Sequence, residues 1–303
     1  MTAFWPLFLP ESTMEFKEIS ESDAQTIYHL EKVIWMGTTN KGVLVSIGDS
    51  AEYGRMLFMG GELQSASNDE RIYHEALVHP AMQRAVANHH VHYTEGLRVL
   101  VVGGGEGATV REVLRWPQVS HVDWVDWDEE AVNNCRQHLQ WAGPETWLDS
   151  RLNTYWDDIQ VVLPRLEGQY DCIVLDLPDP DGNTGWLYSA EFWTALKGRL
   201  SATGVMVTHC GPVRPWGNIG EGFQRVRTAL GDDKIGGFYH TLIPSFQGEW
   251  GFWLIDASTS TVTGASIPMP VDLLVADREQ IAQWFHPTAV WRRAVATALL
   301  PSP

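Results

Sequence analysis

A glycine-rich loop followed at a distance by an acid is the first pattern in the chain that indicates chemistry. Residues 102–107 read VGGGEG, directly after an apolar run and before a segment with helical character. In that position Gly103 and Gly105 let backbone N–H groups approach a nucleotide closely. Asp126 follows nineteen residues after Gly107, where a carboxylate can accept both hydroxyls of a ribose. Glycines also form plain tight turns, but the loop and the spaced acid together favour nucleoside binding.

Glu106 places an acid inside this loop. Its carboxylate would repel a phosphate or another carboxylate, whereas it would attract an ammonium group. The loop therefore favours a ligand that carries a positively charged amine.

A second group of acids surrounds two prolines at residues 171–181, which read DCIVLDLPDPD. The apolar run is typical of a buried parallel strand, and ligands of such sheets bind beyond the carboxyl ends of the strands, where Asp176 would lie. The prolines restrict the residues before them to extended conformations, so Asp176 and Asp179 should be held in fixed directions. An exposed turn rich in Asp and Pro is the alternative reading.

Two further segments combine polar and aromatic residues. The first joins residues 63–65 (LQS) to residues 69–75 (DERIYHE), and each of these residues taken singly is typical of a surface or a packed core. The second, residues 243–252, reads IPSFQGEWGF. It could wall an apolar or cationic site, or it could be a packed hairpin.

The apolar pattern predicts the elements that position these residues. Before residue 90, residues 41–47 begin with the alternation of a strand. Residues 53–59 run into Gly60 and Gly61 before residues 62–64 resume, which indicates a β-hairpin, and a helical stripe begins at about residue 68. We therefore expect residues 1–90 to form a small β-rich N-terminal domain with a linking helix.

From about residue 96 strands alternate with helices, which is typical of a mostly parallel sheet covered on both faces. The predicted strands are residues 98–102, 121–126, 152–156, 171–176 and 204–209, and the predicted helices are residues 109–116, 128–141, 190–200 and 219–230. Asp128 is the expected N-cap of its helix. Residues 237–243 and 251–256 should pair as a final antiparallel hairpin. We expect residues 91–303 to form this α/β domain.

Composition limits the class of protein. The chain has 303 residues, enough for one large or two modest domains, and its 38 acidic against 21 basic residues give a formal net charge of -17. That charge repels nucleic acid and favours a cationic small molecule as ligand, and solubility alone is the alternative explanation. Three cysteines make no disulfide framework or C-x-x-C metal pair. With no apolar run of about 18 residues and no basic N-terminal region, we expect a cytoplasmic protein that does not enter a membrane.

Taken together, these segments resemble the spermidine synthase family, the polyamine aminopropyltransferases. The resembling segments occur in the family's order from about residue 40 to residue 256: they are residues 63–64, 73–80, 99–107, 111–114, 125–128, 170–180, 187–192 and 244–252. The resemblance implies a Rossmann-like, methyltransferase-type doubly wound α/β sheet after a small N-terminal β domain. It also implies transfer of the aminopropyl group of decarboxylated S-adenosylmethionine to putrescine or a similar amine, releasing 5′-methylthioadenosine.

The resemblance also implies roles for individual residues. Asp176 would be the base that accepts the proton of the attacking amine, without a metal or a covalent enzyme intermediate. The residues that would bind the donor as a co-substrate are Gly103, Gly105, Glu106, Asp126, Asp158, Ile159 and His74. The residues that would bind the acceptor amine are Gln64, Tyr73, Asp179, Tyr239 and Trp250. Other members of the family suggest a homodimer or homotetramer.

Three positions differ from the usual family pattern. Glu106 stands where Asp is usual, Leu177 and Pro178 replace small hydroxyl residues, and residues 37–40 lack an aromatic-Gln pair. The identity of the amine therefore stays open. An amine N-methyltransferase that uses intact S-adenosylmethionine is an alternative, although Glu106 would repel the carboxylate of that donor. A non-catalytic protein that binds polyamines is the second alternative.

Overall fold

The computed structural model describes residues 14–19, 25–90, 96–178, 184–230, 235–256 and 267–299. Two small antiparallel sheets come first in these ranges. Their strands are β1 (Met14–Ile19) with β2 (Gln25–Leu30), and then β3 (Lys32–Thr38), β4 (Leu44–Ser50), β5 (Gly54–Met59) and β6 (Glu62–Ala66). Gly60 and Gly61 both have positive φ and connect β5 to β6, which confirms the predicted hairpin.

A seven-stranded sheet forms the centre of the larger part of the molecule. In chain order its strands are β7 (Leu97–Gly103), β8 (Val119–Asp126), β9 (Leu152–Trp156), β10 (Tyr170–Asp176), β11 (Leu200–Pro212), β12 (Ile235–Ile243) and β13 (Gly248–Asp256). In space their order is β12-β13-β11-β10-β7-β8-β9. The strands from β11 to β9 are parallel, whereas β12 and β13 form the predicted antiparallel hairpin.

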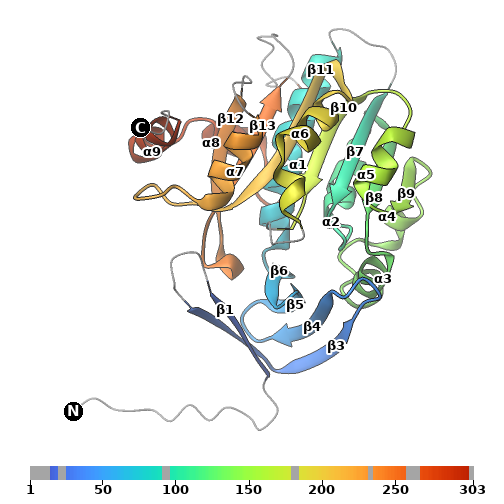
Figure 1. The fold of residues 1–303 in the computed structure, drawn as a ribbon, viewed down its shortest axis with the longest axis vertical. Coiled ribbons are helices and arrows are strands. Elements are labelled where there is room, and N and C mark those ends of the chain that lie inside the picture. Colours follow the sequence, from blue (N-terminus) through green and yellow to red (C-terminus); the bar gives the residue numbers. More distant parts are fainter. Residues whose placement is uncertain are drawn as a thin grey trace.

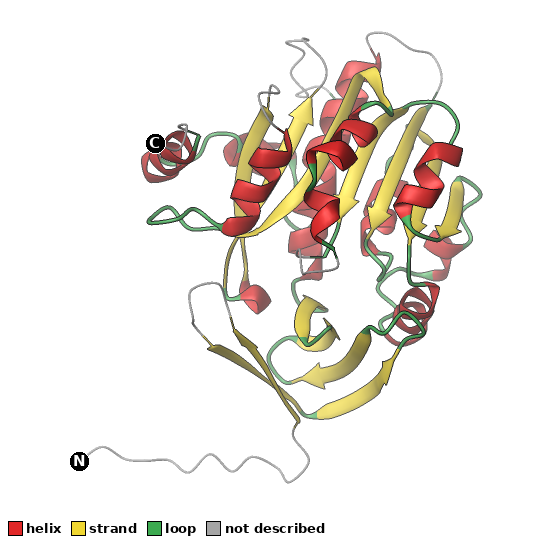
Figure 2. Ribbon diagram, viewed as in Figure 1, coloured by secondary structure: helices red, strands yellow, loops and turns green. Residues whose placement is uncertain are grey.

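Helices cover both faces of this sheet, as Figure 2 shows. On one face lie α1 (Glu70–His90), α2 (Ala108–Leu114) and α8 (Arg278–Trp284), and on the other lie α5 (Ile159–Val162), α6 (Ala190–Lys197), α7 (Glu221–Leu230) and α9 (Ala289–Ala298). Along β7, Val99 and Val101 pack in the hydrophobic core beneath α1, α2 and α8, whereas Leu100 and Val102 pack in the core beneath the helices of the opposite face. The predicted doubly wound α/β architecture is confirmed. The predicted domain boundary after residue 90 stays a prediction. Helix α1, which precedes that boundary in the chain, packs on the large sheet that follows it.

The N-terminal sheets lie beyond the carboxyl ends of the parallel strands (Figure 1). Helix α3 (Glu129–His138) joins the two parts, because its buried side chains pack against β4 and β5. Asp128 is its N-cap, as predicted, and accepts a hydrogen bond from the Ala131 N–H at 3.0 Å. The other oxygen of Asp128 accepts from the Thr39 hydroxyl at 2.6 Å. One buried carboxylate therefore caps a helix and anchors the N-terminal part.

Helix α1 also holds a C-terminal segment. The buried carboxylate of Glu75 accepts hydrogen bonds from the backbone N–H groups of Leu274, Val275 and Ala276 at 2.8, 2.8 and 3.1 Å, and it forms an ion pair with Arg71 at 2.7 Å. These contacts satisfy a carboxylate that has no exposure to solvent. Residues 274–276, shortly before α8, are thus tied to the second turn of α1.

The order of the strands reverses between β7 and β10. From β7 the chain adds β8 and β9 on one side, and β10 then pairs on the opposite side of β7. In open α/β sheets, ligands bind at such a switch point. Here Gly103 pairs with Asp176, and the Gly104 N–H donates to the Asp176 carbonyl at 3.0 Å. A Cβ atom on Gly103 would lie 2.1 Å from that carbonyl oxygen.

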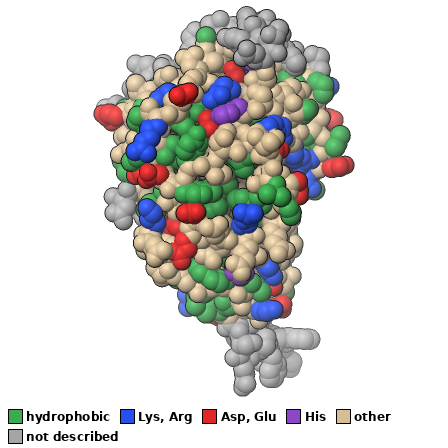
Figure 3. All heavy atoms as spheres, turned by 90° about the vertical axis from the view of Figure 1, so that its right-hand side faces the viewer, with side chains coloured by type: hydrophobic (Ala, Val, Ile, Leu, Met, Phe, Trp, Pro, Cys, Tyr) green, Lys and Arg blue, Asp and Glu red, His purple; other side chains and the backbone are tan. Residues whose placement is uncertain are grey.

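Charged residues of both signs are interspersed on the face of the molecule shown in Figure 3. The acidic excess of the chain is therefore not gathered into one patch on this face. Among the described helices, none is both long enough and apolar enough to cross a membrane.

The contact at Gly103 predicts a large effect of a small substitution. Gly103 has a φ of 80° and no room for a Cβ atom, so Gly103→Ala should lower the free energy of unfolding by about 3 kcal/mol or more. Gly60→Ala is the matched control: its φ is 62°, but nothing lies within 4 Å of the added atom, so only about 1–2 kcal/mol of backbone strain is expected. Urea denaturation measures both, and equal losses would contradict the steric explanation.

Candidate active site

Three carboxylates predicted from separate motifs lie at the carboxyl ends of adjacent strands. Asp176 ends β10, Asp126 ends β8, and Glu106 lies in the loop after β7. A Cβ atom on Gly105 would lie 3.3 Å from Asp126 Oδ2, and one on Gly104 would lie 2.9 Å from Asp176 Oδ2. The glycine loop therefore passes directly between the two aspartates, and the switch point concentrates negative charge.

Asp176 is held by neutral hydroxyl groups. The Tyr73 hydroxyl donates to Oδ1 at 2.7 Å, and the Thr109 hydroxyl donates to Oδ2. Tyr73 comes from α1 and Thr109 from the first turn of α2. Both donors are uncharged, so they orient the carboxylate without cancelling its charge. A carboxylate held in this way can still accept a proton.

Asp126 lies in a buried and acidic environment. Burial, together with the neighbouring charges of Asp128, Glu106 and Asp176, raises the pKa of its carboxyl to about 7, although the Asp128 N–H, which donates to Oδ1 at 3.0 Å, acts in the opposite direction. This group therefore titrates near neutral pH. The ionised form is the one that accepts hydrogen bonds on both oxygens.

Glu106 is turned toward two side chains that satisfy it. The Ser65 hydroxyl of β6 donates to Oε1 at 2.8 Å, and His74 Nε2 lies 3.2 Å from the same oxygen, in an ion pair whose alignment falls short of a hydrogen bond. Burial raises the pKa of Glu106, but His74 and Ser65 outweigh burial and hold that pKa below its usual value. Glu106 is thus a buried carboxylate whose charge is compensated by His74.

His74 is a buried cation between two carboxylates. Its Nδ1 lies 2.9 Å from Glu70 Oε2, and Glu106 approaches the other ring nitrogen. Burial alone would lower the pKa of His74, but its interactions with the carboxylates of Glu106 and Glu70 raise it to about 10. The imidazole therefore carries a positive charge at neutral pH.

The network continues away from the site through α2. Arg111 donates to both oxygens of Glu70 at 2.9 Å and to Glu112 at 2.8 Å. Glu112 lies 2.9 Å from His79 Nε2, and His79 Nδ1 accepts a hydrogen bond from the Trp116 ring N–H at 3.0 Å. Because Nδ1 accepts, His79 donates its Nε2 proton to Glu112. Buried charges of alternating sign thus link Glu106 to the far end of α2.

Aromatic rings surround Tyr73 on the side of β13. Its ring centroid lies 5.9 Å from that of Phe246, 6.0 Å from His209 and 5.7 Å from Phe252. The half-buried Trp250 contacts Phe246 at 4.5 Å, and its ring N–H is buried with no hydrogen-bond partner among the described residues. This wall offers π-faces, and one free donor, beside the hydroxyl that holds Asp176.

The other predicted donor residues lie beside Asp126. Trp156, the last residue of β9, pairs with Asp126, and Asp158 follows two residues later as the N-cap of α5. The Asp158 carboxylate accepts from the Gln160 N–H at 2.8 Å. Ile159 opens the helix, so its N–H has no partner within that helix. The geometry allows contact with a base beside a ribose at Asp126.

Three predicted acceptor residues occupy different surroundings. Gln64 is partly exposed on β6, where its amide donates to the Glu62 carbonyl at 3.3 Å. Asp179 lies outside the described residues. Tyr239 is not brought to the site, because its ring is fully buried and stacked on Phe252 and Trp284, and its hydroxyl donates to the backbone of α1 at 2.8 Å. The Tyr239 prediction is therefore corrected: this side chain supports the wall from one layer behind.

Several site residues were not predicted from the sequence. Thr109 and Arg111 were seen only as part of a helix, and His209 only as the end of a strand. His209 accepts the Gly211 N–H on Nδ1 at 3.3 Å and approaches the Leu177 carbonyl at 2.6 Å through Nε2. Its place at the end of the predicted strand 204–209, as Asp176 ends the predicted strand 171–176, is the signal that could have revealed it. Within the described ranges, no three His, Cys, Asp or Glu side chains form a group that could hold a metal.

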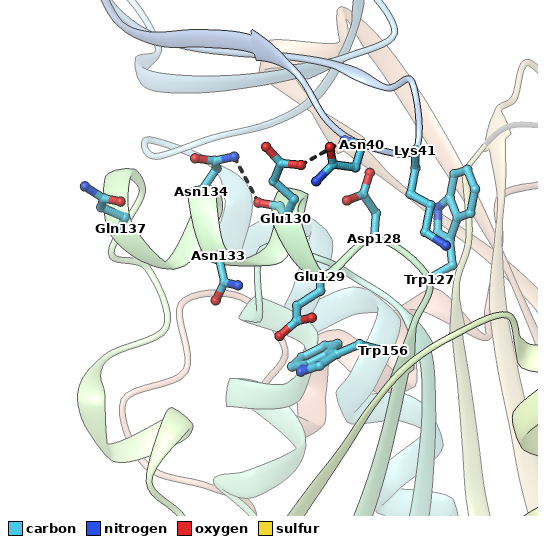
Figure 4. Close-up of a pocket in the computed structure, with 10 residues that line it drawn as sticks. All are labelled: Asn40, Lys41, Trp127, Asp128, Glu129, Glu130, Asn133, Asn134, Gln137 and Trp156. Atoms are coloured by element: carbon cyan, nitrogen blue, oxygen red, sulfur yellow. Dashed lines mark hydrogen bonds between the residues drawn. The ribbon is translucent and has the colours of Figure 1, made fainter.

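A separate cavity of about 380 Å³ lies over the start of α3. Its lining residues, all labelled in Figure 4, are Asn40, Lys41, Trp127, Asp128, Glu129, Glu130, Asn133, Asn134, Gln137 and Trp156. In this view Glu129 lies over Trp156, whereas Asp128 points toward the loop that carries Asn40 (Figure 4). None of the three site carboxylates lines it, so the cavity neighbours the site without forming it.

The His74 cation should contribute strongly to stability. His74→Gln would leave Glu70 and Glu106 facing each other without it, so we expect the free energy of unfolding at pH 7 to fall by about 3–5 kcal/mol. The His74→Gln/Glu106→Gln double variant should recover part of this loss. Because the folded-state pKa is raised to about 10 from a usual 6.5, the advantage of the wild type is complete below pH 6.5 and is lost as pH rises toward 10. Urea denaturation of the wild type and of His74→Gln between pH 6.5 and pH 10 measures this effect. A difference in the free energy of unfolding that stayed constant across this range would contradict the charge explanation.

Known proteins show a consistent similarity to this chain. Residues 70–262 match the Spermine/spermidine synthase domain. Polyamine aminopropyltransferase 2 of Pseudomonas aeruginosa is 33% identical over 258 residues, which cover 82% of this chain and 69% of that protein. The polyamine aminopropyltransferase of Aeropyrum pernix is 34% identical over 241 residues, which cover 78% and 73% of the two chains.

Solved structures have the same fold. A spermidine synthase in complex with the transition-state analogue AdoDATO superposes with a TM-score of 0.82 at 19% identity and covers 95% of this chain and 97% of its own. The spermidine synthase of Thermotoga maritima gives a TM-score of 0.79 at 18% identity, with 95% and 96% covered. At these identities the likeness concerns the fold, whereas the domain match and the sequence relatives concern the family. The chain belongs to the spermine/spermidine synthase family, as the sequence motifs predicted.

Proposed function

We propose that this protein transfers the aminopropyl group of decarboxylated S-adenosylmethionine to a primary amine such as putrescine, which gives spermidine or an analogue and 5′-methylthioadenosine. The observation that carries the proposal is the Asp176 carboxylate, held by two neutral hydroxyls at the switch point of the sheet. The relatives named polyamine aminopropyltransferase support the same reaction.

The donor would lie along the carboxyl ends of β7, β8 and β9. Gly103 and Gly105 leave room for the nucleoside, and Asp126 accepts the ribose hydroxyls. Asp158 and the Ile159 N–H then contact the adenine. Glu106 and His74 border the aminopropyl end of the donor. Because His74 already compensates Glu106, the uncompensated negative charge at the site is that of Asp176 and of ionised Asp126. These two carboxylates favour a donor that carries a sulfonium and an ammonium group.

Asp176 would act as the general base of the transfer. A primary alkylamine, like Lys with a pKa of about 10.4, is almost entirely protonated at neutral pH and has no free lone pair. Asp176 accepts one proton from the amine, and the nitrogen then attacks the methylene next to the sulfonium. The N–C bond forms as the C–S bond breaks, and the bonding pair passes to sulfur. Base catalysis of this kind contributes about 10²–10⁴-fold, and alignment of the reactants contributes further.

The acceptor would enter along the aromatic wall. Tyr73, whose hydroxyl already contacts Asp176, lies beside the nitrogen that reacts. Trp250 supplies a ring face and an unsatisfied N–H farther along, and we assign contacts near the second amine to Gln64 and Asp179. The expected homodimer or homotetramer and the cytoplasmic location stay predictions.

One observation favours a second candidate, an amine N-methyltransferase that uses intact S-adenosylmethionine. The positive charge of His74 weakens the repulsion that Glu106 alone would exert on the carboxylate of that donor. The same Asp176 would then serve methyl transfer. The aminopropyl reaction remains the better supported, because the sequence relatives carry that name.

Mass spectrometry of the products tests the function directly. Purified protein is incubated with a panel of amines and, separately, with the decarboxylated or the intact donor. We expect a gain of one aminopropyl group, with 5′-methylthioadenosine released only from the decarboxylated donor. Asp176→Asn should abolish turnover and leave binding of 5′-methylthioadenosine within about twofold. A methylated amine would establish the second candidate, and no product from either donor would favour a non-catalytic polyamine-binding protein.

Binding of 5′-methylthioadenosine should depend on pH through Asp126. The pKa of this carboxyl is raised to about 7, and only its ionised form accepts both ribose hydroxyls, so affinity should be about tenfold weaker at pH 6 than at pH 8. His74, whose pKa is raised to about 10, keeps its charge across this range. Calorimetry at the two pH values measures the effect. The Asp126→Asn variant should bind 5′-methylthioadenosine weakly, with the same affinity at pH 6 and pH 8. If the affinity of this variant still changed about tenfold between the two pH values, a group other than Asp126 would be responsible.

A further inference from the structure

The hydroxyl of Thr109 contacts the proposed base from a fully buried position. Thr109 is the second residue of α2 and has no exposed surface. The residue before α2, Gly107, has a φ of 80° and makes the turn from the glycine loop into the helix. This turn delivers the Thr109 side chain to Asp176 Oδ2, 67 residues away in the chain. A contact at that separation depends on the packing of α2 against the end of β10.

The two oxygens of Asp176 are held from two different helices. Oδ1 accepts from Tyr73 of α1, and Oδ2 accepts from Thr109 of α2. Within the described part of the chain, Asp176 makes no salt bridge. A carboxylate cannot donate when it is ionised, so both hydroxyl protons must point at it. The plane of the carboxylate is therefore defined by two donors, and neither of them neutralises it.

Close packing at the same oxygen adds a steric constraint. A Cβ atom on Gly104 would lie 2.9 Å from Asp176 Oδ2, 3.3 Å from Thr109 Cβ and 3.4 Å from Thr109 Oγ1. The Asp176 carboxylate and the Thr109 side chain thus both pack against the backbone of the glycine loop. Loss of the hydroxyl would leave Oδ2 without this donor and free the carboxylate to turn.

We propose that Thr109 is a positioning residue for Asp176, which fixes the direction in which the base receives the proton of the amine. This inference rests on the proposed function for its kinetic consequence, but its geometry is independent of the acceptor. Tyr73 borders both the base and the acceptor, whereas Thr109 is buried behind the base. Thr109 should therefore affect the rate of the chemical step and leave substrate binding unchanged.

Thr109→Val tests the proposal, because valine keeps nearly the same shape and lacks the hydroxyl. We expect kcat to fall by about 10- to 100-fold, the range for loss of a hydrogen bond to a charged group. KM for the donor and for the amine, and the affinity for 5′-methylthioadenosine, should stay within about twofold. Thr109→Ser restores the donor and should recover kcat to within about threefold of the wild type.

Three results would overturn the proposal: unchanged kcat in Thr109→Val, a loss shared by KM and by the stability to urea, or a serine variant as slow as the valine variant. A wild-type protein that turns over neither donor would refute the proposed function instead. In that case ¹³C NMR of the side-chain carboxyl of Asp176, identified by its absence in Asp176→Asn, decides the matter. Loss of the Thr109 donor should shift the carboxyl ¹³C resonance in Thr109→Val and leave it near its wild-type position in Thr109→Ser. Identical resonances in all three proteins would refute the contact.

Discussion

The hydrogen bond from the Gly104 N–H to the Asp176 carbonyl, at 3.0 Å, is the contact around which the site is assembled. It joins the ends of two strands that meet only because the strand order reverses there. It requires Gly103 to have no side chain, since an added atom would meet the same carbonyl oxygen. Once the two strand ends are joined, the acid that ends β10 faces the loop that carries Glu106. The chemistry of the site therefore depends on a hydrogen bond between two backbone groups, which brings the reactive side chains together.

Two carboxylates of the site, Glu106 and Asp176, are held in opposite ways. Glu106 is paired with a buried cation, and that cation is itself supported by Glu70 and, through Glu70, by Arg111. Asp176 receives only neutral hydroxyls. Alternating charges make the first acid a fixed part of the structure, because removal of His74 would leave Glu106 buried without a counter-charge. Neutral donors leave the second acid available for proton transfer. This difference separates a structural carboxylate from a reactive one.

The sequence predicted those parts of the fold and the site that depend on local order. Parallel strands were visible as apolar runs, Asp128 as a helix cap, and Asp176 as the acid after a buried strand. The partners of these residues were not visible, because Thr109 and Arg111 reach them only through the packing of α2 on α1 and β10. Tyr239 was assigned to the wrong layer, since alternation along a strand does not tell which face meets a ligand and which meets a helix. The helices α8 and α9 were missed because α8 buries only Ile281 and Trp284 and α9 buries only Trp291, too few for a recognisable apolar stripe.

Three consecutive residues of α1 point to three different partners. Tyr73 reaches Asp176, His74 reaches Glu70 and Glu106, and Glu75 holds the backbone of residues 274–276. Successive residues of a helix are separated by about 100° around its axis, so all three contacts are possible only in one rotational setting. An insertion or deletion of a single residue in this turn would rotate the residues on one side of it by about 100° relative to those on the other, so the three contacts could not all form. The length of this turn is therefore constrained by three separate parts of the molecule at once.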